Sequence, residues 1–155
     1  MITESVVHST ITIERTYPVA PERVFRAWAD PKQKRRWFAE GEGWEVVQFD
    51  LDFREGGRET ARFRHATNNA EFRNEGHYED IVPNRRIVVA YTMSAGDRRI
   101  SASLGTVELR PQGDGTRLVY TEQAAFFDGA DGPRMREQGW RQLLESLANE
   151  LAAPR

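Results

Sequence analysis

The order of the predicted secondary-structure elements constrains the fold of this chain more than any single motif. Residues 9–17 form a strand-like run, and residues 18–38, PVAPERVFRAWADPKQKRRWF, contain two short helices separated by Asp30-Pro31. Strand-like segments follow, and then one long amphipathic helix is predicted over residues 134–152. This order is typical of a fold that encloses a cavity, and therefore of a protein that binds something inside itself.

Composition narrows the functional classes. The 155 residues fit one domain with a buried core, in which we expect residues 1–8 to be flexible. The net charge of -2 gives no indication of a nucleic-acid partner. The absence of cysteine excludes disulfides and thiolate chemistry. No apolar run approaches the roughly 20 residues that span a bilayer, and no secretory signal is present, so we expect a cytoplasmic protein.

A basic cluster lies in the second short helix and comprises Lys32, Lys34, Arg35 and Arg36. Charges of one sign on a short helix usually form its solvated face. We therefore expect this cluster to lie in solvent and not to mark a binding surface.

Two central strands can be paired by counting outward from a two-residue turn at Asn68-Asn69. This register places Arg62 opposite Glu75 and Glu59 opposite Tyr78. The charged set suits the exposed face, because a slip of one residue would bury it. The residues then predicted to face inward are Glu59, Ala61, Phe63, His65, Phe72, Asn74, Gly76 and Tyr78.

The later strands continue this inner face. The residues in phase with it are Val89, Tyr91 and Met93 on one strand and Leu118, Tyr120 and Glu122 on the last. Between these strands Ile100, Ala102 and Leu104 alternate, Gly105 marks a bulge, and Val107 and Leu109 resume the alternation. The apolar stripe of the terminal helix comprises Met135, Gly139, Trp140, Leu143, Leu144, Leu147 and Leu151. The loop that starts at Phe126 either covers the cavity as a lid or ties the chain to the sheet.

Five segments resemble a known family in their order along the chain. They are PERVFxAWxDPxxxxxWF at 21–38, DxRxGG at 52–57, GxYxDIVPxxRIV at 76–88, TRLxxTE at 116–122 and GWxxxLxxLAxxL at 139–151. The chain resembles the SRPBCC superfamily and, more narrowly, the family named for the activator of the heat-shock-protein-90 ATPase. The resemblance implies the α+β helix-grip (START-like) fold. In that fold a curved antiparallel sheet of six or seven strands surrounds a long C-terminal helix, with a cavity between them and two short helices near one end.

Two features depart from the family's pattern. Glu59 follows Gly57-Arg58 at a position that is usually apolar or aromatic in such proteins. The chain also lacks the separate N-terminal domain of the eukaryotic co-chaperones, which implies a bacterial stand-alone member.

The candidate ligand-binding residues are the polar inward residues together with aromatic residues at the expected entrance. They are Trp37, Phe38, Glu59, Phe63, Asn74, Tyr78, Tyr91, Tyr120 and Glu122. A mostly apolar pocket with a few placed polar groups is typical of small-molecule sites. The alternative for Glu59 and Glu122 is that both lie near the open ends of the fold and reach water. We predict no catalytic residue, cofactor or metal site, since His65 and His77 fall on opposite faces of the sheet.

Three functions remain open from the sequence. The preferred one is binding of a small apolar or amphipathic molecule in the internal cavity, without chemistry. The second is an enzyme of the cyclase, aromatase or hydrolase type that uses an inward carboxylate–tyrosine pair as general acid or base. The third, implied by the family name, is an interaction module that stimulates a chaperone ATPase. A homodimer is compatible with the sequence, although no feature requires one.

Overall fold

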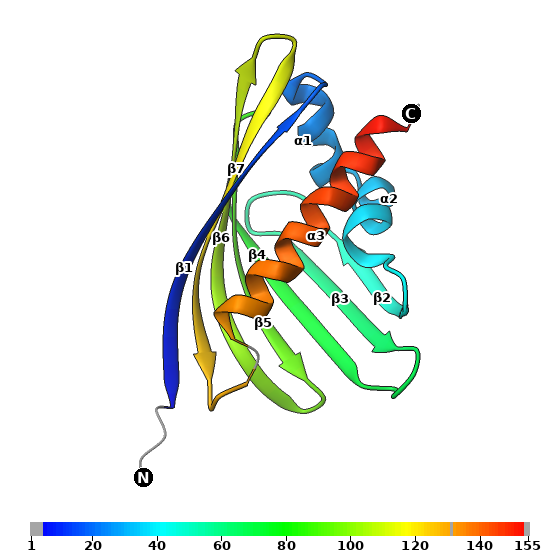
Figure 1. Ribbon diagram of the computed structural model, residues 1–155, viewed down its shortest axis with the longest axis vertical. Helices are drawn as coiled ribbons and strands as arrows, with labels where there is room; N and C mark the ends of the chain where they lie inside the picture. The colour runs from blue at the N-terminus through cyan, green and yellow to red at the C-terminus, as the bar shows by residue number, and fades with distance from the viewer. Residues whose placement is uncertain (1–4, 131, 154–155) are drawn as a thin grey trace.

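A curved sheet packs around one long helix in this protein. The computed structural model describes residues 5–130 and 132–153. Figure 1 shows helix α3 (Pro133–Ala152) crossing the concave face of the sheet, with the shorter helices near its C-terminal end. These are α1 (Pro21–Ala29), α2 (Pro31–Lys34) and the π-helical segment η1 (Arg35–Ala39). The arrangement is the helix-grip fold, so the predicted fold is confirmed.

The sheet contains seven antiparallel strands in the order β1-β7-β6-β5-β4-β3-β2. They are β1 (Val6–Tyr17), β2 (Trp44–Leu51), β3 (Arg58–His65), β4 (Glu71–Val82), β5 (Arg86–Ala95), β6 (Arg98–Gln112) and β7 (Gly115–Phe127). Strands β2 to β6 each pair with the next strand along the chain, whereas β1 pairs with β7. We expected residues 1–8 to be flexible. Residues 1–4 lie outside the described part of the chain, whereas residues 6–8 belong to β1 and pair with the end of β7.

The short helices begin and end where the sequence indicates. Pro21 lies in the first turn of α1, where its missing N–H group leaves no hydrogen bond unmade. Asp30 then caps α2, because its carboxylate accepts a hydrogen bond from the backbone N–H of Gln33 at 2.9 Å. The segment ends in a wider turn that the sequence did not indicate, in which the N–H of Glu40 donates to the carbonyl of Arg35 at 3.0 Å.

The connection between β3 and β4 is longer than the predicted two-residue turn at Asn68-Asn69. Residues 66–70 form it, and the register shifts by two residues, so that Glu59 pairs with Gly76 and not with Tyr78. The predicted register is therefore wrong. Because side chains alternate with a period of two, an even shift leaves every side chain on its predicted face.

The same shift changes the charge pairs on the outer face. Arg62 lies opposite Arg73 and not opposite Glu75, as the two-residue turn predicted. Its guanidinium group instead forms an ion pair with Glu71, with an Nη2–Oε1 distance of 2.5 Å. This ion pair therefore runs diagonally across the two strands.

Strand β6 contains a bulge, but five residues before the predicted position. The pairing of β5 with β6 shifts at Ile100, whereas Gly105 pairs regularly. Ser101 and Ser103 are buried as a result, and Leu104 is among the exposed large hydrophobic residues. The predicted bulge at Gly105 is wrong. Because of this error, the hydroxyl groups of Ser101 and Ser103 were not predicted to face inward.

Helix α3 buries a narrower stripe than the sequence predicted. Leu144, Leu147 and Leu151 are buried in the core, as expected. Met135 is 66% exposed, and Arg136 is buried in its place at the start of the stripe. No helix of the described residues is long and apolar enough to cross a membrane.

Candidate functional site

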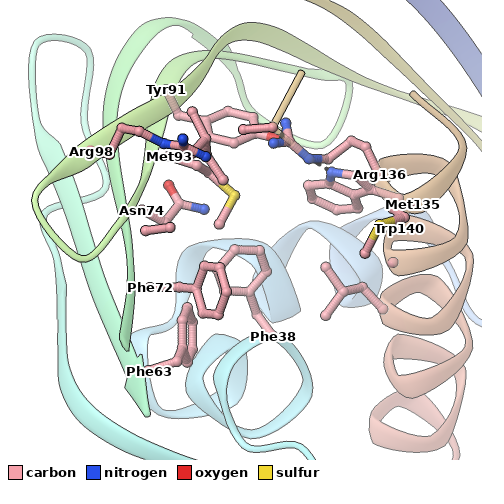
Figure 2. A pocket seen from close by; sticks show the side chains of 15 residues that line it. Phe38, Phe63, Phe72, Asn74, Tyr91, Met93, Arg98, Met135, Arg136 and Trp140 are labelled. Carbon is pink, nitrogen blue, oxygen red and sulfur yellow. Dashed lines mark hydrogen bonds between the residues drawn. The ribbon is translucent and has the colours of Figure 1, made fainter. Parts of the chain in front are cut away.

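A cavity of about 450 Å³ lies between η1, strands β3 to β6 and helix α3 (Figure 2). Its lining comprises Phe38, Phe63, Phe72, Asn74, Tyr91, Met93, Ala95, Arg98, Ile100, Ala130, Met135, Arg136, Gly139, Trp140 and Leu143. Most of these side chains are apolar, and several are aromatic. This size and lining are typical of small-molecule sites, which measure about 300–1,000 Å³.

The periodicity of the surrounding elements explains the lining. Phe63, Asn74 and Tyr91 come from three neighbouring strands and share the inner face of the sheet. On α3 the lining residues recur at the spacing of one helical face. Gly139 is one of them, and a Cβ atom built there would meet nothing within 4 Å. The missing side chain at Gly139 therefore widens the cavity.

Asn74 is a buried polar residue in the wall of the cavity. Only 8% of the residue is exposed, and its Oδ1 atom has no hydrogen-bond partner among the residues that the structure describes. An unpaired buried amide typically costs about 1–3 kcal/mol of folding free energy. Figure 2 shows the amide directed into the cavity, where a bound molecule could satisfy it.

A buried charge network forms the floor of the cavity. The guanidinium group of Arg136 donates to Glu122 Oε2 at 2.9 Å, to Ser101 Oγ at 2.7 Å and to Ser103 Oγ at 3.1 Å. It also donates to the hydroxyl group of Tyr91 at 3.0 Å. A buried carboxylate needs such a partner, because an uncompensated charge in the interior is strongly destabilising.

Two tyrosines hold the other carboxylate oxygen of this network. The hydroxyl groups of Tyr91 and Tyr120 both donate to Glu122 Oε1, the second at 2.7 Å. Burial raises the pKa of Tyr91, and the negative charge of Glu122 raises it further. Burial likewise raises the pKa of Tyr120 well above its usual value. Both hydroxyl groups therefore stay protonated and act as donors to the carboxylate.

A second buried pair lies deeper in the molecule. Lys34 Nζ is 2.5 Å from Glu59 Oε1 and 3.3 Å from the Tyr78 hydroxyl group, which itself donates to Glu59 Oε1 at 2.8 Å. The ammonium group also lies 4.5 Å from the ring centre of Phe38. Burial, followed by the charge of Glu59, raises the pKa of Tyr78. The predicted solvated position of Lys34 is therefore wrong.

Glu59 and Glu122 do not reach water. They are 4% and 1% exposed, respectively, and each is bonded to a tyrosine and to a cation. The alternative that places both at the open ends of the fold is therefore wrong.

A void of about 20 Å³ separates the deeper pair from the main cavity. Phe38, Asn74, Tyr91 and Trp140 line both spaces. These four side chains form the partition between the cavity and the Lys34 region. The void is large enough for about one water molecule.

The structure brings part of the candidate set together. Phe38, Phe63, Asn74 and Tyr91 line the cavity, and Glu59, Tyr78 and Tyr120 line the void. Glu122 lies beneath Tyr91 and lines neither space. Trp37 is not brought to the cavity: its ring packs edge-on against Trp28 at 4.7 Å, and its N–H donates to the carbonyl of Ala27 at 2.8 Å.

Three cations of this region were not predicted from the sequence. Lys34, Arg98 and Arg136 each contribute to the cavity, the void or the floor, and none was predicted to do so. A signal was available, because two inward carboxylates require two inward cations. The segment that starts at Phe126 was predicted to be either a lid or a tie to the sheet. Phe126 belongs to β7 and is therefore part of the sheet. The guanidinium group of Arg136 lies 5.1 Å from the ring centre of Phe126.

The register of β3 and β4 keeps His65 and His77 apart. Glu59 and Gly76 pair across β3 and β4, so His65 and His77 lie on opposite faces of the sheet, as predicted. Among residues 5–130 and 132–153, no group of three or more His, Asp or Glu side chains could hold a metal ion.

Comparison with known proteins identifies relatives over nearly the whole chain. The structure is similar to the Mll3558 protein from Rhizobium loti, with 54% identity, a TM-score of 0.87 and coverage of 95% of this chain and 99% of that one. It is also similar to an uncharacterized protein from Rhizobium leguminosarum, with 43% identity, a TM-score of 0.91 and coverage of 95% and 96%. An AHSA1-like protein from Aeromonas hydrophila shares the fold at 21% identity, with a TM-score of 0.68 and coverage of 92% of both chains.

No curated protein matches the chain. Residues 18–152 match the family model described as Activator of Hsp90 ATPase homolog 1-like protein. This range contains all five segments that carried the resemblance. The chain therefore belongs to the Activator of Hsp90 ATPase homolog 1-like family, within the SRPBCC superfamily.

Proposed function

We propose that this protein binds a small apolar or amphipathic molecule in the cavity between the sheet and α3, and performs no chemistry on it. The observation that carries the proposal is a cavity of about 450 Å³, lined mainly by apolar and aromatic side chains. The amide of Asn74 projects into it, and its Oδ1 atom has no hydrogen-bond partner among the described residues. Phe38, Phe63 and Tyr91, from the predicted set, provide contacts for the guest. Glu59, Tyr78, Tyr120 and Glu122 support the wall and the floor behind them.

The enzymatic alternative has its geometric premise, because both inward carboxylates are bonded to tyrosines. However, Glu122 already accepts hydrogen bonds from Tyr91, Tyr120, Ser103 and Arg136. A general base needs a free lone pair directed at its substrate. The raised pKa of Tyr91 also makes its hydroxyl group a poor proton donor to a substrate. These contacts favour a structural role for the network. Activation of a chaperone ATPase stays a prediction drawn from the family name.

A dye-binding assay with two variants at one position tests the proposal. The neutral dye N-phenyl-1-naphthylamine should gain fluorescence when it enters the cavity. Gly139→Phe should abolish the gain, because the added ring would occupy open space in the cavity. Gly139→Ala is the matched control, since one methyl group leaves most of the volume free.

Native mass spectrometry of protein purified from its own host complements this assay. We expect a stoichiometric small molecule that mild denaturation releases. Equal dye binding by the wild type, Gly139→Phe and Gly139→Ala would contradict the proposed cavity site.

A further inference from the structure

The charged side chains that line the cavity are positive among the described residues. The lining contains Arg98 and Arg136 and, among the described residues, no carboxylate. Arg136 is neutralised by Glu122 at 2.9 Å. Arg98, in contrast, forms no ion pair with any residue that the structure describes. One uncompensated positive charge therefore belongs to the cavity.

Arg98 lies at the mouth of the cavity. It is the first residue of β6, is exposed, and lines the cavity but not the inner void. Figure 2 shows its side chain extending over the cavity beside Met93. A guanidinium group in this position can bind a carboxylate through two parallel hydrogen bonds.

Asn74 lies deeper in the cavity than Arg98, on the strand next to Met93. It lines both the cavity and the inner void, whereas Arg98 lines only the cavity. It is more than nine-tenths buried, and its Oδ1 atom lacks a partner among the described residues. An amide so placed can pair with a hydroxyl group of a guest.

Aromatic rings line much of the rest of the cavity. Phe38, Phe63, Phe72, Tyr91 and Trp140 all face it. Aromatic pairs prefer edge-on or offset stacking, which a flat ring system can satisfy with several of these side chains at once.

We infer that the guest is an aromatic carboxylic acid, with its carboxylate at Arg98, its ring system among the aromatic side chains and a hydroxyl group at Asn74. This inference rests on the proposed function and specifies the chemical class of its ligand. The acid enters with its apolar end first, because the charged end finds its partner only at the mouth of the cavity.

Three probes of nearly equal size separate the parts of this inference. They are 6-hydroxy-2-naphthoic acid, 2-naphthoic acid, which lacks the hydroxyl group, and 6-hydroxy-2-naphthamide, which lacks the charge. Affinities are measured by isothermal titration calorimetry for the wild type and for Arg98→Gln. Arg99→Gln is the matched control, because it removes the same charge from a neighbouring exposed residue that does not line the cavity.

Arg98→Gln should weaken binding of both acids at least about tenfold, since a charge-assisted hydrogen bond is lost. It should change the affinity of the amide by less than about twofold. Arg99→Gln should leave all three affinities unchanged. Asn74→Leu should weaken the hydroxylated acid until it binds no better than 2-naphthoic acid, because the partner of the hydroxyl group is removed.

Two results would overturn the inference. The first is an equal loss for the acids and the amide in Arg98→Gln. The second is failure of all three probes to bind wild-type protein that does bind N-phenyl-1-naphthylamine, which would leave the proposed function intact. Failure of the dye as well would contradict both the inference and the proposed function.

Discussion

The hydroxyl oxygen of Tyr120 lies 2.7 Å from the point that a Cβ atom at residue 105 would occupy. Gly105 is therefore required by the ring of Tyr120 and not by a bend in the strand. The absence of a side chain at this position lets the hydroxyl group reach Glu122.

We expect Gly105→Ala to lower the free energy of unfolding by about 1–3 kcal/mol, because the added methyl group overlaps the hydroxyl group of Tyr120. The cost should be smaller in a Tyr120→Phe background, where the overlapping oxygen is absent. Urea unfolding of the four proteins of this cycle measures the difference. An equal cost in both backgrounds would show that Tyr120 is not the cause.

The pair Lys34–Glu59 gives a second stability prediction. Lys34→Met should lower the free energy of unfolding by about 3–5 kcal/mol, because it leaves the buried carboxylate of Glu59 without its cation. Lys32→Met, on an exposed neighbour in the same helix, should have little effect. The double variant Lys34→Met/Glu59→Leu should recover most of the loss. Urea unfolding measures all three, and similar losses for Lys34→Met and Lys32→Met would contradict the burial of this pair.

All four tyrosines of the chain are buried, and burial raises the pKa of each of them. A raised pKa means that the folded protein holds these protons more tightly than the unfolded chain does. Their contribution to stability is complete below the unfolded pKa of about 10 and is lost as the pH rises above it. Each such tyrosine lowers the free energy of unfolding by about 1.4 kcal/mol per pH unit in that range.

We therefore expect no tyrosine to ionise near pH 10 while the protein is folded. In a titration followed by absorbance at 295 nm, the tyrosinate signal should appear in one cooperative step that coincides with loss of the near-UV circular dichroism. The same titration in concentrated guanidinium chloride should show ordinary ionisation near pH 10. A tyrosinate signal near pH 10 with intact circular dichroism would contradict the prediction.

Gly139 offers a variant that should separate stability from binding. Gly139→Ala should raise the free energy of unfolding by about 1 kcal/mol, because alanine is favoured over glycine inside a helix and its methyl group meets no neighbour. Dye binding should be retained. Thermal unfolding with and without the dye measures both effects, and a loss of stability would show that residue 139 is already closely packed.

The faces of the strands could be predicted from the sequence, whereas their pairing could not. The alternation of polar and apolar residues placed Glu59, Asn74 and Tyr78 on the inner face, and the shift by two residues left them there. The length of the loop at 66–70 depends on turn geometry that Asn68-Asn69 alone does not specify. A turn position therefore predicts which face of the strand a residue occupies, but not which residue lies opposite it.

The charge network escaped prediction for a different reason. A pattern of apolar residues locates the core side of a helix, but it assigns every lysine or arginine to the solvent. Arg136 was missed in this way. Its hydroxyl partners Ser101 and Ser103 were missed because the bulge at Ile100 reverses the phase of the strand. Such networks depend on contacts between segments far apart in the sequence, which local patterns do not contain.

The pairing of β1 with β7 has a consequence for the order of assembly. Strands β2 to β7 can form successive hairpins as each emerges from the ribosome, but β1 finds its partner only when residues 115–127 have been synthesised. Until β7 has been synthesised, β1 has no partner strand in this sheet. Closing this long loop is the slow kind of contact in folding. Of the strands in this sheet, β1 is thus the earliest to be synthesised and among the last to be paired.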